Sequence, residues 1–402
     1  MAQKPELNIG TTAVLETQPS PKAVGKSKGG FTIGLPCESS KTEKRIALTP
    51  DSVSVLVRNG IQVLVEKGAG IPANFEDEAY AKAGAEISFS KEQVYGCEIV
   101  IKVDPPSVDE IAFMQPETAL LSALQFSKQS KEYFKALVDK RITAIAYEHM
   151  EDTAGNLSII RAMSEIAGSS AVLLASEYLA KEKGMLLGGI AGVPPTSVVI
   201  LGAGTVAEFA ARAALGLGAD IKIFDLYLYR LQRLRYALGQ HIFTSIIDSQ
   251  NLGKALADAD VVIGAIRSEK GMTPLVVTED MVEKMKKGSV IVDVAIDQGG
   301  CVETSSLTTH QVPVFTKHGV THYAVPNIAS RVGHTASCSL SNIFTPLLMQ
   351  VQNLGGMDEM ILSNHWFLKG VYAFKGNVTH QNIAKKFNLR HRDLRLLLAA
   401  RI

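Results

Sequence analysis

The chain has 402 residues, of which 46% are hydrophobic and 20% are charged, and its formal net charge at pH 7 is +1. This length is too great for one compact core and is typical of two domains. The balanced charge argues against nucleic acid as a partner and favours a small molecule. The four cysteines form neither a disulfide framework nor a metal-ligand spacing, so we expect reduced thiols and no metal site. They are Cys37, Cys97, Cys301 and Cys338.

No membrane or secretory segment is expected in this sequence. No run reaches the ~18 consecutive apolar residues that a membrane helix needs, and the N-terminal stretch lacks the apolar centre of a secretory signal. Residues 1–30 combine prolines with Ser, Thr, Lys and Gly and show no periodicity, which predicts a disordered tail. We therefore expect a cytoplasmic protein without a membrane partner.

From Phe31 onward, apolar strands alternate with helical stretches. The sequence predicts a strand at 31–36, a helix at 50–59 and, at 61–70, a strand that runs into a glycine loop. Further along, it predicts a helical stretch at 80–83 and strands at 96–103, 119–124 and 143–147. This alternation is typical of a parallel, doubly wound sheet.

The second half begins with a long apolar helix predicted at 159–183. Strands are then expected at 197–201, 221–224, 261–265, 289–295 and 322–327, followed by a helix at 336–353 that could return to the first domain. Residues 382–400 form a basic amphipathic segment, for which a solvated helix face is favoured over membrane or calmodulin contact.

The expected fold class is α/β, with two doubly wound Rossmann-like domains and an interdomain cleft. We predict a substrate domain from residues 31–158 plus 335–402 and a nucleotide-binding domain from residues 159–334.

The most informative stretch is SVVILGAGTVAEFAAR at residues 197–212, which reads as strand, tight turn and helix. Gly202 permits the turn, Gly204 allows the backbone to approach a pyrophosphate, and Ala207 still permits close helix-to-strand packing. Asp225 ends the next strand about 20 residues later, where an acid can accept the adenosine ribose hydroxyls. A glycine turn in another α/β unit is the alternative, but this order of elements favours a dinucleotide site.

The cofactor predicted from this site is NAD. Asp225 places negative charge where NADP carries its extra phosphate. Arg230, Arg233 and Arg235 follow closely, so NADP stays open as an alternative.

Three further stretches add to this fingerprint: GLPCESSKTEKRIALTP at 34–50, MSEIAG at 163–168 and VDVAIDQGGCVE at 292–303. Together with the glycine turn, they resemble the alanine dehydrogenase and transhydrogenase α-subunit family. Alanine dehydrogenases carry the motif AIDQGG, whereas transhydrogenase α subunits usually have another residue in place of the acid. Asp297 therefore makes this chain more similar to the dehydrogenases. The resemblance extends over about residues 31–402.

The resemblance implies roles for individual residues. Arg45 would grip a substrate carboxylate, as a planar two-pronged cation suits, and Asp297 would orient and polarise the substrate at the nicotinamide. Taken alone, Arg45 would more often be a surface arginine ahead of a strand, and Asp297 would more often be an ordinary acid in a turn. Both residues occur at the positions that the family motifs require, and this agreement favours a functional role. The implied cofactor contacts are Ser164 at the phosphates, Asp225 at the ribose, Gly264, Ala265 and Ile266 along the nucleotide trough, and Asn327 beside the carboxamide.

Two positions depart from the family pattern. The chain reads KVDPP where alanine dehydrogenases have KVKEP, so Asp104 replaces a substrate-binding lysine. It reads ALQ where they have FLH, so Gln125 replaces a proton-exchanging histidine. Transhydrogenase α subunits lack the same two residues. Asp104 could pair with Arg45, or receive a cationic group on a different substrate.

Three nearby side chains are candidates to repopulate the site. Lys102 is retained, and the altered segment NIASRVGHT introduces Arg331 and His334. Lys102, His334 or ordered water could take the vacated roles, or these could stay unfilled.

The predicted function is NAD-dependent oxidative deamination of a small L-amino acid, most simply L-alanine to pyruvate and ammonia. The alternatives are an NAD(H)-binding module of transhydrogenase type, or a divergent member with another substrate or no amino-acid turnover. Family resemblance, together with the apolar helix at 159–183, implies a homo-oligomer, either a hexamer or a dimer.

Overall fold

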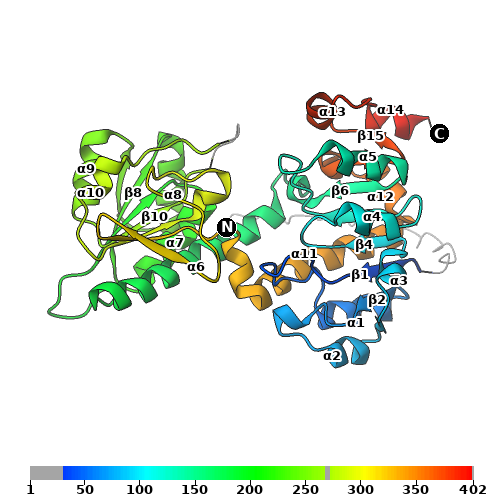
Figure 1. Ribbon diagram of the computed structural model, residues 1–402, viewed down its shortest axis with the longest axis horizontal. Helices are drawn as coiled ribbons and strands as arrows, with labels where there is room; N and C mark the ends of the chain where they lie inside the picture. Colours follow the sequence, from blue (N-terminus) through cyan, green and yellow to red (C-terminus); the bar gives the residue numbers. More distant parts are fainter. Residues whose placement is uncertain (1–29, 268–271, 401–402) are drawn as a thin grey trace, which may run out of the picture.

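The computed structural model describes residues 30–267 and 272–400; the predicted tail, apart from Gly30, lies outside them. The chain forms two α/β lobes joined by the long helix α6 (Ser158–Lys183) (Figure 1). The C-terminal part of the chain returns to the lobe that contains the N-terminal strands, so segments far apart in sequence share one lobe.

The first sheet has the strand order β15-β14-β6-β5-β4-β1-β2-β3. Its strands are β1 (Thr32–Leu35), β2 (Gln62–Glu66), β3 (Glu86–Ser88), β4 (Ile99–Ile101), β5 (Ala119–Ser122), β6 (Thr143–Ala146), β14 (Val371–Phe374) and β15 (Asn377–Val378). The first six are parallel, and β14 and β15 are antiparallel additions at one edge. The order reverses between β1 and β4, where a doubly wound sheet opens a crevice at its carboxyl edge.

The second sheet has the order β12-β13-β11-β10-β7-β8-β9. Its strands are β7 (Ser197–Leu201), β8 (Asp220–Asp225), β9 (Phe243–Ile246), β10 (Val261–Gly264), β11 (Val290–Asp293), β12 (Val314–Lys317) and β13 (Val320–Tyr323). All pairs are parallel except β12 with β13. Because helices cover both faces, the central strands are buried throughout and their sequences are nearly continuous apolar runs.

The helices that flank the sheets are mostly short. In the first lobe they are α1 (Pro50–Arg58), α2 (Asp77–Lys82), α3 (Lys91–Tyr95), α4 (Val108–Phe113), α5 (Lys131–Asp139), α11 (Gly333–Leu354), α12 (Met357–Ser363), α13 (Gln381–Phe387) and α14 (Leu394–Ala399). In the second they are α7 (Thr205–Gly216), α8 (Leu228–Leu238), α9 (Ser249–Ala257) and α10 (Glu279–Glu283).

Helix α6 packs along α7 and also contacts α11. Gly168 permits the first contact, because a Cβ there would lie 2.2 Å from the carbonyl oxygen of Val206. By length and composition alone α6 is apolar enough to cross a membrane, as the core helix of a soluble protein also can be. Its buried apolar side chains, among them Ala171, Val172 and Leu179, pack into the core of the second lobe.

The predicted fold class is confirmed, and every predicted strand overlaps an observed one. One element is wrong: residues 382–400 form two short helices, α13 and α14, rather than one. Asn388 adopts a left-handed conformation (φ 51°) that ends α13. The antiparallel strands β12, β14 and β15 were also not predicted.

Candidate active site

Arg45 lies in the loop between β1 and α1, at the carboxyl edge of the first sheet, and so precedes a helix rather than a strand. Serine hydroxyls hold the backbone of this loop. The N–H groups of Lys44, Ile46 and Thr49 donate to the hydroxyls of Ser330, Ser337 and Ser341, respectively, at 2.8, 2.8 and 2.9 Å. These serines lie in the 3₁₀ segment η4 (Ile328–Val332) and in α11, so the chain's return fixes the loop that carries Arg45.

The Arg45 guanidinium forms a two-pronged ion pair with Glu43. Its Nε donates to Oε1 at 2.7 Å and its Nη2 donates to Oε2 at 2.5 Å. Burial alone would raise the pKa of Glu43, but the hydrogen bonds and charge of Arg45 outweigh it and hold that pKa below its usual value. The pair uses two of five guanidinium N–H groups, so one edge of Arg45 keeps its donors for a second carboxylate.

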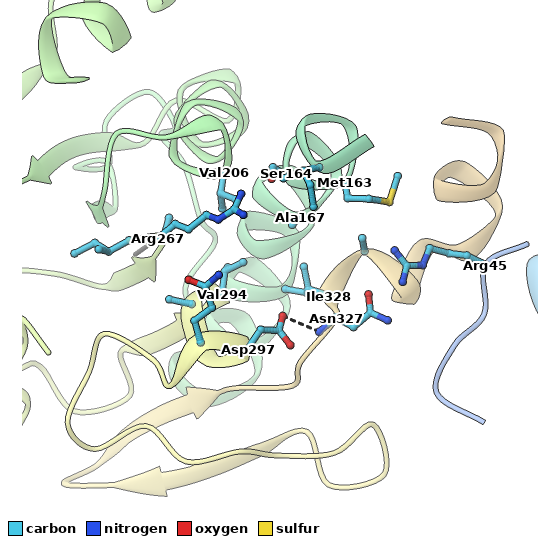
Figure 2. A pocket seen from close by; sticks show the side chains of 16 residues that line it. Arg45, Met163, Ser164, Ala167, Val206, Arg267, Val294, Asp297, Asn327 and Ile328 are labelled. Atoms are coloured by element: carbon cyan, nitrogen blue, oxygen red, sulfur yellow. Dashed lines mark hydrogen bonds between the residues drawn. The ribbon is translucent and has the colours of Figure 1, made fainter. Parts of the chain in front are cut away.

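Hydrogen bonds link this ion pair to the second lobe. The Nδ2 of Asn327 donates to Glu43 at 2.9 Å, and the backbone N–H of Asn327 donates to Asp297 at 3.2 Å. Figure 2 shows the second bond as a dashed line, with Arg45 extending toward the cavity from the opposite side. The structure thus brings Arg45, Asn327 and Asp297 to one place.

The cavity between the lobes has a volume of about 260 Å³. Its lining includes six of the predicted site residues: Arg45, Ser164, Ala265, Ile266, Asp297 and Asn327. Helix α6 supplies Ser164 on one wall, while η3 (Val294–Gln298) supplies Asp297 on another (Figure 2).

The glycine turn borders a second cavity of about 590 Å³ at the start of α7. Gly202 has φ +109°, and a Cβ there would lie 2.6 Å from the carbonyl oxygen of Ala265. Gly204 has nothing within 4 Å of its Cβ position. Gly204 is also the N-cap and offers no side-chain cap, so the first N–H groups of α7 can bind an anion. This open backbone suits the pyrophosphate of a dinucleotide.

Other predicted cofactor residues form the frame of the site. Ala207 is fully buried, as close packing of α7 requires. A Cβ on Gly264 would lie 2.7 Å from the Cys301 sulfur, so Gly264 makes room for packing. Asp225 is 3% exposed, and its two oxygens accept the backbone N–H groups of Ala203 and Tyr227 at 2.7 and 2.8 Å. Each oxygen has a second lone pair for a ribose hydroxyl.

Comparison with known proteins decides the family. The models described as "Alanine dehydrogenase/PNT, N-terminal domain" and "Alanine dehydrogenase/PNT, C-terminal domain" match residues 34–167 and 171–381. The chain belongs to the alanine dehydrogenase/PNT family. It is 42% identical to alanine dehydrogenase of Bacillus subtilis (strain 168) over 357 residues, which cover 88% of this chain and 94% of the relative.

Other members of the alanine dehydrogenase/PNT family give the same result. Alanine dehydrogenase of Methanococcus maripaludis is 40% identical, with 89% of this chain and 96% of the relative covered. A solved L-alanine dehydrogenase superposes with a TM-score of 0.84 at 37% identity, covering 89% of this chain and 99% of that chain. The transhydrogenase from Sinorhizobium meliloti superposes with a TM-score of 0.74 at 25% identity, covering 87% of this chain and 99% of that chain.

The two residues predicted to depart from the alanine dehydrogenase motifs lie at the carboxyl edge of the first sheet, where Asp104 follows β4 and Gln125 follows β5. The Gln125 N–H donates to Glu148 at 2.8 Å. Lys102 and Asp104 both lie beyond the end of β4. The Nζ of Lys102 and the backbone N–H of Asp104 donate to the same carboxylate oxygen of Glu38, at 3.0 and 3.1 Å, respectively.

The candidate substitutes for the lost family residues point elsewhere. Lys102 is fully buried against Glu38. The ring of His334 stacks on Phe75, and its Nδ1 lies 2.9 Å from the carbonyl oxygen of Ala73. Arg331 pairs with Glu177 on α6 at 3.3 Å. None of these three residues is among the described residues that line the Arg45 cavity, and neither are the predicted site residues Asp104 and Gln125.

Glu43, Met163 and Arg267 are among the site residues that escaped the sequence-based prediction. Glu43 is two positions before Arg45 in the quoted signature, and that spacing was a usable signal. Arg267 follows Ile266 at the end of β10 and lines both cavities, but an isolated arginine after a strand carries no pattern.

Proposed function

We propose that the protein is an NAD-dependent alanine dehydrogenase that converts L-alanine to pyruvate and ammonia. The observation that carries this proposal is the hydrogen-bonded series Arg45, Glu43, Asn327 and Asp297, which joins the carboxyl edges of the two sheets. The lower identity to a transhydrogenase than to alanine dehydrogenases favours this function over the transhydrogenase-type alternative.

NAD held in the second lobe supplies the hydride acceptor. The N–H groups at the start of α7 and the Ser164 hydroxyl bind its phosphates, and Asp225 accepts its ribose hydroxyls. Arg230 lines the larger cavity beside the glycine turn and contributes positive charge near the phosphates. Ala265, Ile266 and Asn327 line its nicotinamide end.

The substrate carboxylate binds the free edge of Arg45, and Asp297 orients the substrate at the nicotinamide. Glu43 keeps Arg45 in one orientation, so little conformational entropy is lost on binding. We propose that residues 31–158 plus 335–402 form the substrate domain and residues 159–334 the NAD-binding domain, with the substrate in the cleft between them. Closure of the two lobes would exclude water from the reacting atoms.

We expect NAD to bind more tightly than NADP, because Asp225 would lie beside the extra phosphate of NADP. Asp225→Asn keeps the side-chain shape but removes the charge. It should bring the two dissociation constants within a few-fold of each other in calorimetric titrations, while the wild type prefers NAD by at least about tenfold, or about 1.4 kcal/mol. NADPH binding as tightly as NADH to the wild type would contradict the cofactor assignment.

We propose that the protein is a homo-oligomer. Exposed apolar side chains on α6 and in the loop that follows it support this: Leu173, Leu186, Ile190 and Val193 are 57–63% exposed. Light scattering should give a mass of at least two chains at micromolar concentration, and Ile190→Glu should lower it. A monomeric wild type would rule out the oligomer.

We also propose a soluble, cytoplasmic protein whose partners are small molecules rather than nucleic acid or membrane. The packing of α6 on α7 and α11 supports a soluble core role for that helix.

The direct test of function is NADH formation measured at 340 nm across a panel of L-amino acids. We expect L-alanine to give the highest kcat/KM. Tight NAD binding without turnover of any amino acid would instead favour a nucleotide-binding module.

A further inference from the structure

In the first sheet the strand order reverses between β1 and β4, and such a reversal is where a doubly wound sheet opens a crevice. The loop after β1 carries Arg45, and Asp104 follows the end of β4. Because parallel neighbours end at the same edge, these oppositely charged side chains flank one crevice, the position where doubly wound sheets bind ligands.

Most charged groups at this edge already have partners. Lys102 is bound to Glu38 and Arg45 to Glu43. Glu148 accepts the backbone N–H groups of Leu124 and Gln125 at 3.2 and 2.8 Å. These side chains are committed to holding the edge together.

Asp104 is different. Its backbone N–H and carbonyl are bonded, but no side chain or backbone group of residues 30–267 or 272–400 makes a hydrogen bond or ion pair with its carboxylate. The carboxylate is partly buried, and an unpaired carboxylate in such a place is costly. The protein retains this cost at the edge of its substrate crevice.

The charges around Asp104 define its acidity. Burial and then the charge of Glu43 raise the pKa of Asp104, while Arg45, Lys102 and Lys128 lower it, and the net direction is upward. A carboxylate with a raised pKa is a better proton acceptor at neutral pH than an exposed aspartate.

We propose that Asp104 binds the α-ammonium group of the amino-acid substrate and accepts its proton, so that an acid performs the proton transfer in this chain. This inference rests on the proposed function and deepens it. A small amino acid has one carboxylate and one ammonium group, and the crevice offers the free edge of Arg45 for the first and Asp104 for the second. Gln125 cannot take this role, because an amide does not titrate near neutral pH.

Deamination begins with the transfer of a proton from the substrate nitrogen. One ammonium N–H bond breaks, its proton passes to Asp104, and a neutral amine remains. The Cα–H bond breaks, its electron pair leaves as hydride to the acceptor that bound NAD supplies, and the nitrogen lone pair forms the C=N bond. Water then adds to carbon, and Asp104 returns its proton to nitrogen. Ammonia leaves, the water oxygen stays in pyruvate, and the two water protons pass to solvent.

The test compares Asp104→Asn with Asp109→Asn, which makes the same chemical change on an exposed residue of α4. Alanine and pyruvate are titrated by calorimetry into enzyme saturated with NADH, and kcat/KM for alanine is measured from pH 5 to 10. Pyruvate is the informative control, because it has the carboxylate but lacks the ammonium group.

We expect Asp104→Asn to weaken alanine binding at least tenfold and to leave pyruvate binding and the NAD dissociation constant unchanged. It should lower kcat/KM about 10²–10⁴-fold, the usual contribution of a general base. The wild-type rate should fall as pH drops through the pKa of Asp104, and the variant should lose this limb. The thermal midpoint should not fall, since the carboxylate has no partner to lose. Asp109→Asn should match the wild type.

Two outcomes separate the inference from the proposed function. Equal loss of alanine and pyruvate binding in Asp104→Asn, or kcat/KM within about threefold of the wild type with the same acid limb, overturns the role of Asp104. Wild-type enzyme that binds alanine through Asp104 but never reduces NAD overturns the dehydrogenase function and the proton transfer, while ammonium recognition by Asp104 stands.

Discussion

Replacing Gly204 with alanine is expected to weaken NAD binding at least 100-fold without destabilising the protein. The Cβ position on Gly204 meets no atom within 4 Å, and Gly204 has an ordinary φ of −82°. The folded protein therefore accepts the methyl group. That methyl group would occupy the space through which the pyrophosphate must approach the first N–H groups of α7. Calorimetric titration measures the loss of binding, and a thermal unfolding curve measures stability.

Gly202→Ala is the matched comparison, because it adds the same methyl group two residues earlier. There the backbone has φ +109° and the Cβ would lie 2.6 Å from a carbonyl oxygen, so we expect destabilisation of roughly 2–4 kcal/mol. The two variants thus separate cofactor contact from backbone strain. Wild-type NAD affinity in a folded Gly204→Ala variant would show that the pyrophosphate binds elsewhere.

The second large effect is expected from Arg45→Met. It removes the cation proposed to bind the substrate carboxylate, and two hydrogen bonds to a charged group are worth about 3–6 kcal/mol, or about 10²–10⁴-fold in kcat/KM. It also leaves Glu43 buried without its ion-pair partner, which typically costs about 3–5 kcal/mol of stability. Steady-state kinetics and chemical denaturation measure the two effects.

Adding Glu43→Gln to Arg45→Met separates these effects. The double variant has no unpaired buried charge, so its stability should return close to that of the wild type. Its activity should stay low, since the substrate carboxylate still lacks Arg45. Recovery of alanine turnover in the double variant would mean that Arg45 acts only through Glu43 and does not contact the substrate.

Local pattern predicted the central strands and the long helices well, because β7, β10 and β11 are buried apolar runs between turn signals. It failed where burial is partial or the element is short. Strand β9 is only partly buried and shows no alternation, and β15 has two residues. Such strands form by hydrogen bonding to the exposed edge of a neighbouring strand. Their own sequences carry no pattern that indicates this pairing.

Some residues of the candidate site could likewise be predicted from the sequence, and others could not. The glycine turn and Asp225 are local in sequence, so spacing identified them as candidates. Resemblance supplied Arg45 and Asp297, and the structure brings both to the cavity. Neither the spacing nor the resemblance revealed that Glu43 pairs with Arg45, or that Lys102 forms an ion pair with Glu38. The pairing of Lys102 with Glu38 depends on a contact between segments 64 positions apart, whereas Glu43 lies only two positions before Arg45.

The serine hydroxyls that hold the Arg45 loop also constrain the order of folding. Lys44, Ile46 and Thr49 are separated from their serine partners by 286, 291 and 292 positions. Contacts at such separations form late, since a long intervening chain must first be ordered. During synthesis the loop lacks its serine partners until η4 and α11 have left the ribosome, although the second sheet lies wholly upstream of both. The nascent chain can therefore assemble the second sheet with its glycine turn before it can fix the loop that carries Arg45.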